Sequence, residues 1–139
     1  MKNKILFATY TIAIIAITAF SSRYVVNKGI NDRYNLSYNS SKQVADSIVE
    51  NKLDNAYNSL SNDYKANQTL DSFQTKVKDS GFIGNSNKYY IQYMGQNSNS
   101  IVAFTITDKS GAVIGTIYTE TAKQDSGKWA VDDVQLIKQ

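Results

Sequence analysis

An uncharged run near the start of the chain, Ile5–Phe20, constrains its structure more than any other feature. Lys2 and Lys4 precede the run and Arg23 follows it. As a helix the run would extend ~24 Å, or ~27 Å with the next two serines, against a bilayer hydrocarbon core of ~30 Å. Flanking Lys and Arg are typical of membrane segments. We therefore expect residues 5–22 to anchor the chain in a lipid bilayer as a single pass, with the C-terminal part outside the cytoplasm.

Two other interpretations of the run stay open. A cleaved secretory signal has an apolar region of roughly 7–15 residues and ends in a small-x-small motif. Ala19-Phe20-Ser21 fits that motif loosely, and cleavage there would give a secreted protein. The run could also be a helix buried in a globular core. Its apolar character on every side, its place at the N-terminus and its basic flank favour the membrane instead.

Composition excludes several kinds of site. The chain has no cysteine, so it can form no disulfide or thiolate metal site, and no histidine, the commonest general base near neutral pH. The first 28 residues hold four basic side chains and no acid, whereas the remaining 111 hold eleven basic and twelve acidic ones, a net charge of −1. A nucleic-acid-binding protein needs a basic face. We therefore predict no nucleic-acid partner, and we expect no metal and no cofactor.

The chain divides into an anchor or signal at residues 1–26, a polar linker at 27–40 and one domain at 41–139. The domain should begin with a long helix from Ser41, which can cap its start, to Leu60. The apolar stripe of this helix follows helical spacing and consists of Ala45, Ile48, Val49, Leu53, Ala56 and Leu60.

A second, shorter helix is predicted after Thr69, a residue suited to cap its start. Gly81 is placed to end it in a left-handed conformation. Phe73 lies among its apolar residues. Between the two helices, Ser61–Asp63 breaks the first pattern, and Tyr64 is expected to pack within the connection.

After the second helix the hydrophobic period changes to two, which predicts strands. Four are expected, joined by polar turns: Lys88–Met94, Ser100–Thr107, Ala112–Lys123 and Lys128–Lys138. In the last strand, apolar side chains form two alternating pairs that differ in phase by one residue: Trp129 with Val131, and Val134 with Leu136. A β-bulge at Asp132-Asp133 would turn all four inward.

Helices followed by an antiparallel meander predict an α+β domain, with the long and the short helix packed on a curved four-stranded sheet. Three features carry a resemblance: the helix end Ala56–Ser61, then Tyr64-Lys65 and Phe73, and the last strand Gly127–Val134. In this order they resemble small bacterial extracytoplasmic domains of the cystatin-like, nuclear-transport-factor-2-like superfold. The resemblance covers about residues 41–138. Many such domains follow a single N-terminal membrane segment.

The resemblance implies a conical pocket between helix and sheet. Enzymes of the superfold resemble ketosteroid isomerases or dehydratases and use an Asp, His or Tyr inside it. The candidate pocket or sheet-face residues here are Tyr57, Tyr64, Tyr93, Phe104, Tyr118 and Trp129. Without histidine, a tyrosine with Asp132 or Asp133 is the only plausible acid–base pair. Tyrosines near a sheet usually bury the ring and keep the hydroxyl wet, so we expect no enzyme activity.

Two acidic segments could suggest cation sites. Asp46, Glu50 and Asp54 are spaced to share one helix face and could bind a cation or a basic partner, although a solvated face is the ordinary explanation. Asp108–Gly111 superficially resembles a calcium loop, but it has too few carboxylates. A hairpin turn explains it better.

Three functional hypotheses follow. The leading one is a membrane-tethered, non-enzymatic domain that binds another protein, or itself, through an edge or the open face of the sheet. The second is a small-ligand carrier or weak Tyr/Asp enzyme, which a deep pocket of ~300 Å³ or more with converging polar groups would favour. The third, by architecture alone, is an assembly subunit of a secretion or conjugation apparatus.

Overall fold

The computed structural model describes residues 33–90 and 100–139. The chain divides into two compact units, Met1–Tyr34 and Asn35–Gln139. The predicted membrane segment at residues 5–22, and Tyr93, lie outside the described residues. Of the helices within the described ranges, none combines the length and the apolar character that crossing a bilayer requires.

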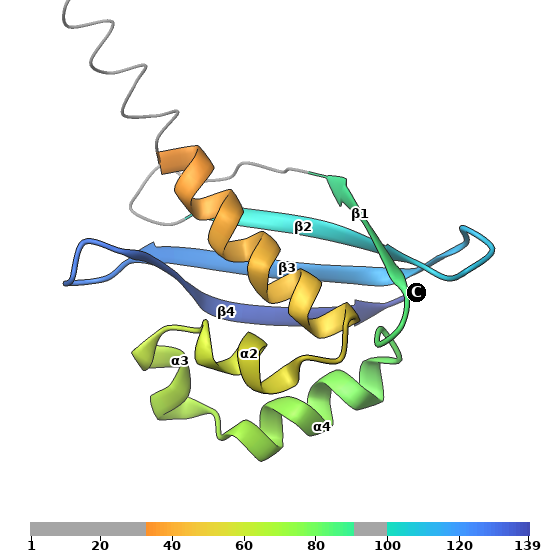
Figure 1. The fold of residues 1–139 in the computed structure, drawn as a ribbon, viewed down its shortest axis with the longest axis horizontal. Helices are drawn as coiled ribbons and strands as arrows, with labels where there is room; N and C mark the ends of the chain where they lie inside the picture. Colours follow the sequence, from red (N-terminus) through yellow and green to blue (C-terminus); the bar gives the residue numbers. More distant parts are fainter. Residues whose placement is uncertain (1–32, 91–99) are drawn as a thin grey trace, which may run out of the picture. The chain divides into compact units, whose positions relative to one another are not determined.

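The second unit contains helices first and strands afterwards, so the predicted α+β class is confirmed (Figure 1). A helix over residues 33–49 is followed by three shorter ones: α2 (Leu53–Asn58), α3 (Asn62–Asn67) and α4 (Leu70–Ser80). The strands are β1 (Ser86–Tyr90), β2 (Ser100–Thr107), β3 (Val113–Lys123) and β4 (Trp129–Lys138). The bounds of β2 are those expected from the sequence, and those of β3 and β4 differ from expectation by one residue.

The strands form an antiparallel sheet in the order β1-β2-β3-β4. One face is buried: Phe104, Ile117 and Val134, on three adjacent strands, are at most 1% exposed. Ile48 of the first helix and Phe73 of α4 belong to the same apolar cluster. Side chains along β3 alternate between buried and partly exposed. This pattern is typical of a sheet with helices on one face only.

The predicted β-bulge in the last strand is confirmed. Glu120 pairs with Asp133 and Thr121 pairs with Val131, so Asp132 has no partner on β3. The extra residue shifts the alternation by one position. Val131 and Val134 are therefore both buried, at 0% and 1% exposure, although they lie three positions apart in the sequence.

The single long helix predicted for residues 41–60 is wrong at its centre, because the helix ends at residue 49 and α2 begins at Leu53. Asn51 adopts a left-handed conformation with φ of 59°. The backbone N–H of Lys52 bonds to the carbonyl of Ser47 at 2.8 Å, and that of Asn51 bonds to Ile48 at 3.1 Å. These two bonds form a Schellman motif. The motif satisfies the last carbonyls of the first helix and turns the chain before α2.

The linker predicted for residues 27–40 is also wrong in its described part, because residues 33–40 are helical. Ser37 is 2% exposed, and its Oγ lies 2.5 Å from Oγ1 of Thr121 on β3. Ser41 is fully buried as well. This end of the helix thus packs on the sheet through small polar side chains, which an analysis of apolar spacing does not detect.

The two ends of α4 agree with prediction. Thr69 Oγ1 accepts a hydrogen bond from the backbone N–H of Ser72 at 3.2 Å, and Gly81 is left-handed with φ of 71°. The connection before it was expected to be irregular but forms α3. Ser61 begins that helix because its Oγ accepts the backbone N–H of Tyr64 at 3.0 Å.

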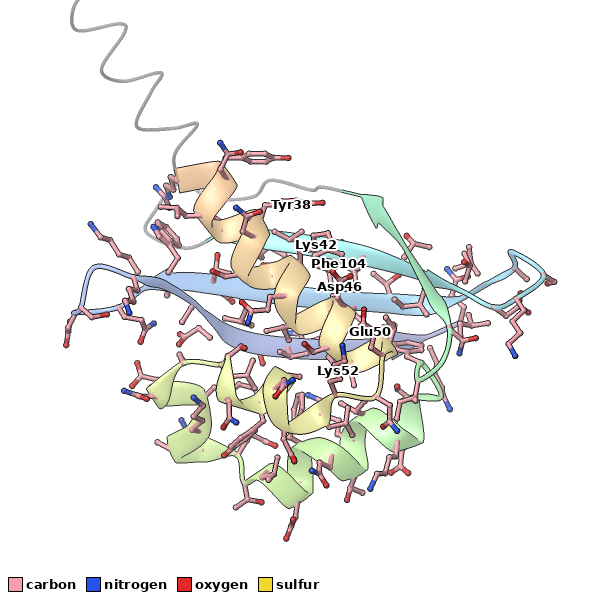
Figure 2. The ribbon with its side chains drawn as sticks, in the orientation of Figure 1. Tyr38, Lys42, Asp46, Glu50, Lys52 and Phe104 are labelled. Atoms are coloured by element: carbon pink, nitrogen blue, oxygen red, sulfur yellow. The ribbon has the colours of Figure 1, made fainter. Side chains whose placement is uncertain are left out.

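The acidic residues of the predicted helix face do not form a common site. Figure 2 shows Asp46 beside Lys42 on the first helix, and Glu50 and Lys52 beyond its end. Asp46 and Lys42 form an ion pair, and Glu50 pairs with Lys52 at 2.7 Å. In the described residues no cluster of acidic side chains is arranged to hold a metal ion.

The turn between β2 and β3 is the predicted hairpin turn. Oδ1 of Asp108 accepts hydrogen bonds from the backbone N–H groups of Ser110 at 2.8 Å and Ala112 at 3.0 Å. The Ser110 hydroxyl donates to the same oxygen and, with these amides, lowers the pKa of Asp108. The carboxylate therefore closes the turn together with the backbone bonds from Asp108 to Ala112 and from Gly111 to Asp108.

Candidate functional site

The structure does not gather the candidate residues into one pocket. Phe104 is fully buried in the core, whereas Trp129 is partly exposed at the start of β4. Tyr118 alternates with the buried Ile117 and lies on the opposite face of the sheet. Tyr57 and Tyr64 do lie together. Their ring centroids are 5.8 Å and 6.3 Å from that of Phe73.

Tyr64 lines a polar hollow of about 300 Å³ where α3, α4 and β4 meet. The bulge of β4 supplies Asp132 and Asp133, so the hollow contains the predicted tyrosine–aspartate combination. Lys76 comes from α4, and the remaining lining residues are Asp63, Asn67 and Gln68. Three carboxylates and one ammonium group give the hollow a formal excess of two negative charges.

Hydrogen bonds fix the residues on β4. Oδ1 of Asp132 accepts from the Ser61 hydroxyl at 2.6 Å. Asp133 accepts from the backbone N–H of Val134 at 2.8 Å and from the Gln135 amide at 3.0 Å. These hydrogen bonds hold the two carboxylates in place beside the hollow.

Lys76 does not neutralise these carboxylates directly. Its ammonium donates to the backbone carbonyl of Val134 at 2.7 Å. The salt bridges found in the described part of the chain join other residues. Within the described residues, no salt bridge therefore offsets the formal excess of negative charge in the hollow.

The Tyr64 hydroxyl is the unusual group of the site. The residue is 6% exposed, and its hydroxyl is buried without a hydrogen-bond partner. Burial, assisted by the negative charge of Asp133, raises the pKa of Tyr64 to about 12. The phenol is thus neutral near pH 7 and poorly matched to proton transfer there. Leaving such a group unpaired costs roughly 1–3 kcal/mol, so the hydroxyl is suited to bind a polar group of a ligand.

A larger hollow of about 430 Å³ lies beside α2 and α4, but it offers no comparable group. Most of its polar lining residues are exposed, and the side chain of Gln74 donates to Asp54 across it at 2.8 Å. We therefore treat the hollow at Tyr64 as the candidate site.

We expect Tyr64 to make stability fall at alkaline pH. Its folded pKa of about 12 exceeds the ordinary 10.0, so the folded protein holds the phenolic proton more tightly than the unfolded chain does. The resulting stability is fully present below about pH 10 and is lost as pH rises through about 12. Two pKa units correspond to roughly 2–3 kcal/mol. Urea unfolding at a series of alkaline pH values should show this loss in the wild type and not in Tyr64→Phe.

The matched control is Tyr57→Phe. The Tyr57 hydroxyl donates to the backbone carbonyl of Gln68 at 2.6 Å. Its removal should cost about 1 kcal/mol near pH 7 and leave the alkaline loss in place. If the free energy of unfolding fell equally with alkaline pH in the wild type and in Tyr64→Phe, Tyr64 would not be the source of the loss.

No protein-family model matches this chain, and no curated protein matches it either. The geometry of the hollow and of the sheet is therefore the basis for assigning a function.

Sequence reasoning missed Asp63 and Lys76 as members of the site. Both are exposed polar residues on helices, and nothing in the local pattern distinguishes them from a solvated face. The phase slip at Asp132-Asp133 was the one sequence signal that marked this position, because it placed two carboxylates at a bulge.

Proposed function

We propose that this chain is a membrane-tethered, extracytoplasmic, non-enzymatic domain of the cystatin-like, nuclear-transport-factor-2-like type that binds another protein. The uncharged segment at residues 5–22 supports the tether. The arrangement of α helices on one face of an antiparallel sheet supports the fold family. The partner would bind the other face of the sheet, which we call the outer face.

Within the described residues, side chains on the outer face of β2 and β3 are partly exposed, and this exposure carries the proposal. In β2 and β3, Ile101, Thr105, Thr116 and Tyr118 alternate with the buried core positions and are partly exposed. Gln135 on β4 pairs with Tyr118 and is exposed. None of these residues belongs to the apolar cluster beneath the helices. Mixed aromatic, aliphatic and polar side chains of this kind are typical of non-obligate protein interfaces.

The face is favoured over the β4 edge, because the edge is obstructed. The backbone N–H of Ser61 donates to the carbonyl of Val131 at 2.8 Å, and Lys76 donates to that of Val134. The bulge at Asp132 also interrupts the regular spacing of backbone groups between Val131 and Val134. An added strand would therefore find the central carbonyls of this edge occupied.

A small-ligand protein is the second candidate, and the hollow at Tyr64 favours it. The volume between the first helix and the sheet does not, since Ile48, Phe104 and Ile117 fill it with no exposed surface. A ligand would therefore occupy the hollow at the β4 edge and not the cone that the resemblance implies.

A photocrosslinking amino acid placed at Gln135 tests the protein-binding proposal in intact cells. We expect one discrete crosslinked product from Gln135 and none from the exposed Asn55 on α2, which lies away from the outer face. Similar products from both positions, or none from either, would contradict the outer face as the binding surface.

Protease digestion of intact cells tests the tether. Digestion of residues 41–139 before lysis, with the N-terminal segment retained in the membrane fraction, is the expected result. Protection until lysis would contradict the extracytoplasmic placement, and a soluble full-length chain would contradict the anchor.

A further inference from the structure

We propose that the hollow between α3, α4 and β4 receives a basic side chain, arginine or lysine, from the bound protein. This inference rests on the proposed protein-binding function and names the chemistry that the partner contributes. A guanidinium or ammonium group is the shared chemistry, and a free polyamine is the other source that could supply it.

Charge is the first observation. Asp63, Asp132 and Asp133 line the hollow with a single cation, Lys76, and the Lys76 ammonium is already bonded to a backbone carbonyl. The Asp63 carboxylate and Oδ2 of Asp132 accept no hydrogen bond from the described residues. These oxygens are available to N–H donors, and carboxylates are the acceptors that guanidinium groups match best.

The Tyr64 hydroxyl is the second and independent observation. It is buried, it has no partner, and its residue lines the same hollow. Tyr64 lines the hollow together with the carboxylate residues Asp132 and Asp133. A neutral phenol can accept an N–H as well as donate. A cation bonded to Asp132 would therefore satisfy a buried group that is otherwise orphaned.

The position of the hollow explains why a protein would supply the cation. Asp133 lines this hollow and also a shallow depression of about 90 Å³ on the outer face, which Ile101, Tyr118 and Gln135 border. A partner seated on the outer face could therefore extend one long side chain past the bulge into the hollow. Within the described residues, no group of three or more acidic side chains is arranged to hold a metal ion.

The test is a titration of the full-length, ¹⁵N-labelled chain in detergent micelles, followed by NMR. The probe is the peptide acetyl-Gly-Gly-Arg-Gly-Gly-amide, and its neutral twin carries citrulline in place of arginine. We expect the arginine peptide to shift the amide signals of Tyr64, Lys76, Asp132 and Asp133. The citrulline peptide should bind at least roughly tenfold more weakly.

Three variants define the site. The double variant Asp132→Asn/Asp133→Asn keeps the side-chain shapes and should weaken the arginine peptide roughly tenfold. Tyr64→Phe should weaken it as well, although this variant should fold more stably, so a merely structural role would not produce the loss. Asp79→Asn removes a charge from α4 outside the hollow and should leave binding unchanged.

Equal shifts with both peptides, or no localised shift with either, would overturn the inference. A second outcome would also overturn the inference. Spermidine would bind as tightly as the arginine peptide, and the crosslink at Gln135 would be unchanged in the double variant. The hollow would then be a site for free polyamines. A crosslink that persists in the double variant leaves the protein-binding proposal intact. If the wild-type chain gives no crosslink but still binds the arginine peptide, the protein-binding proposal fails and only the preference of the hollow for a basic group remains.

Discussion

Phe73→Ala should lower the free energy of unfolding by about 4 kcal/mol, because it removes a fully buried aromatic ring and leaves a cavity. Phe73 packs against Tyr57 and meets Tyr64 edge-on, with planes 88° apart. It therefore supports the fold and the base of the candidate site together. Urea unfolding followed by the fluorescence of Trp129 measures the change.

Two neighbouring variants are the controls. Phe73→Leu keeps most of the volume and should cost about 1 kcal/mol, the contribution of the aromatic contacts. Thr75→Ala alters an exposed position of the same helix and should change stability by less than about 0.5 kcal/mol. A loss for Phe73→Ala no larger than that for Thr75→Ala would mean that α4 does not pack on the sheet as described.

Local signals explain the parts of the fold that the sequence predicts well. Thr69 and Gly81 mark the ends of α4 because a hydroxyl caps a helix start and a left-handed glycine ends a helix. The phase slip at Asp132 predicts the bulge because a strand has a period of two. Each of these signals acts within a few residues and needs no tertiary partner.

The predictions of the first helix and of the linker fail because small polar residues take roles that glycine or apolar residues usually have. Asn51 ends the first helix in the left-handed conformation that glycine usually takes, while the apolar spacing of Leu53 continues the pattern past the break. Ser37 packs on the sheet through a hydroxyl pair with Thr121. Such contacts depend on a partner far along the chain, so the segment looks like a polar linker when it is considered alone.

The candidate site was predictable only in part. The absence of histidine restricted acid–base chemistry to tyrosine and aspartate, and the structure brings Tyr64, Asp132 and Asp133 to one hollow. Strand alternation separates Tyr118 from Phe104, because they face opposite sides of the sheet. The resemblance to the superfold implied a common cone for these residues, and the packing of this particular core excludes it.

Gly115→Val should be among the most disruptive single substitutions in the described residues, with an expected loss of about 3 kcal/mol or more. Gly115 lies on the buried face of β3. A Cβ there would overlap the backbone oxygen of Ile137 and lie 2.5 Å from the Phe82 ring. The backbone oxygen belongs to the β3–β4 pairing and cannot move away without breaking it. The measurement is the urea midpoint of the purified chain, or the soluble yield where the variant does not fold.

Thr116→Val is the matched control, because the next residue points to the outer face and its Cβ is already present. It should change stability by less than about 1 kcal/mol. Phe82→Leu removes one of the two obstacles, so the double variant Phe82→Leu/Gly115→Ala should lose less than the sum of its single losses. The remaining loss reports the contact with the Ile137 oxygen. Strict additivity in this pair would contradict the close packing of Phe82 on Gly115, which joins the end of α4 to the centre of the sheet.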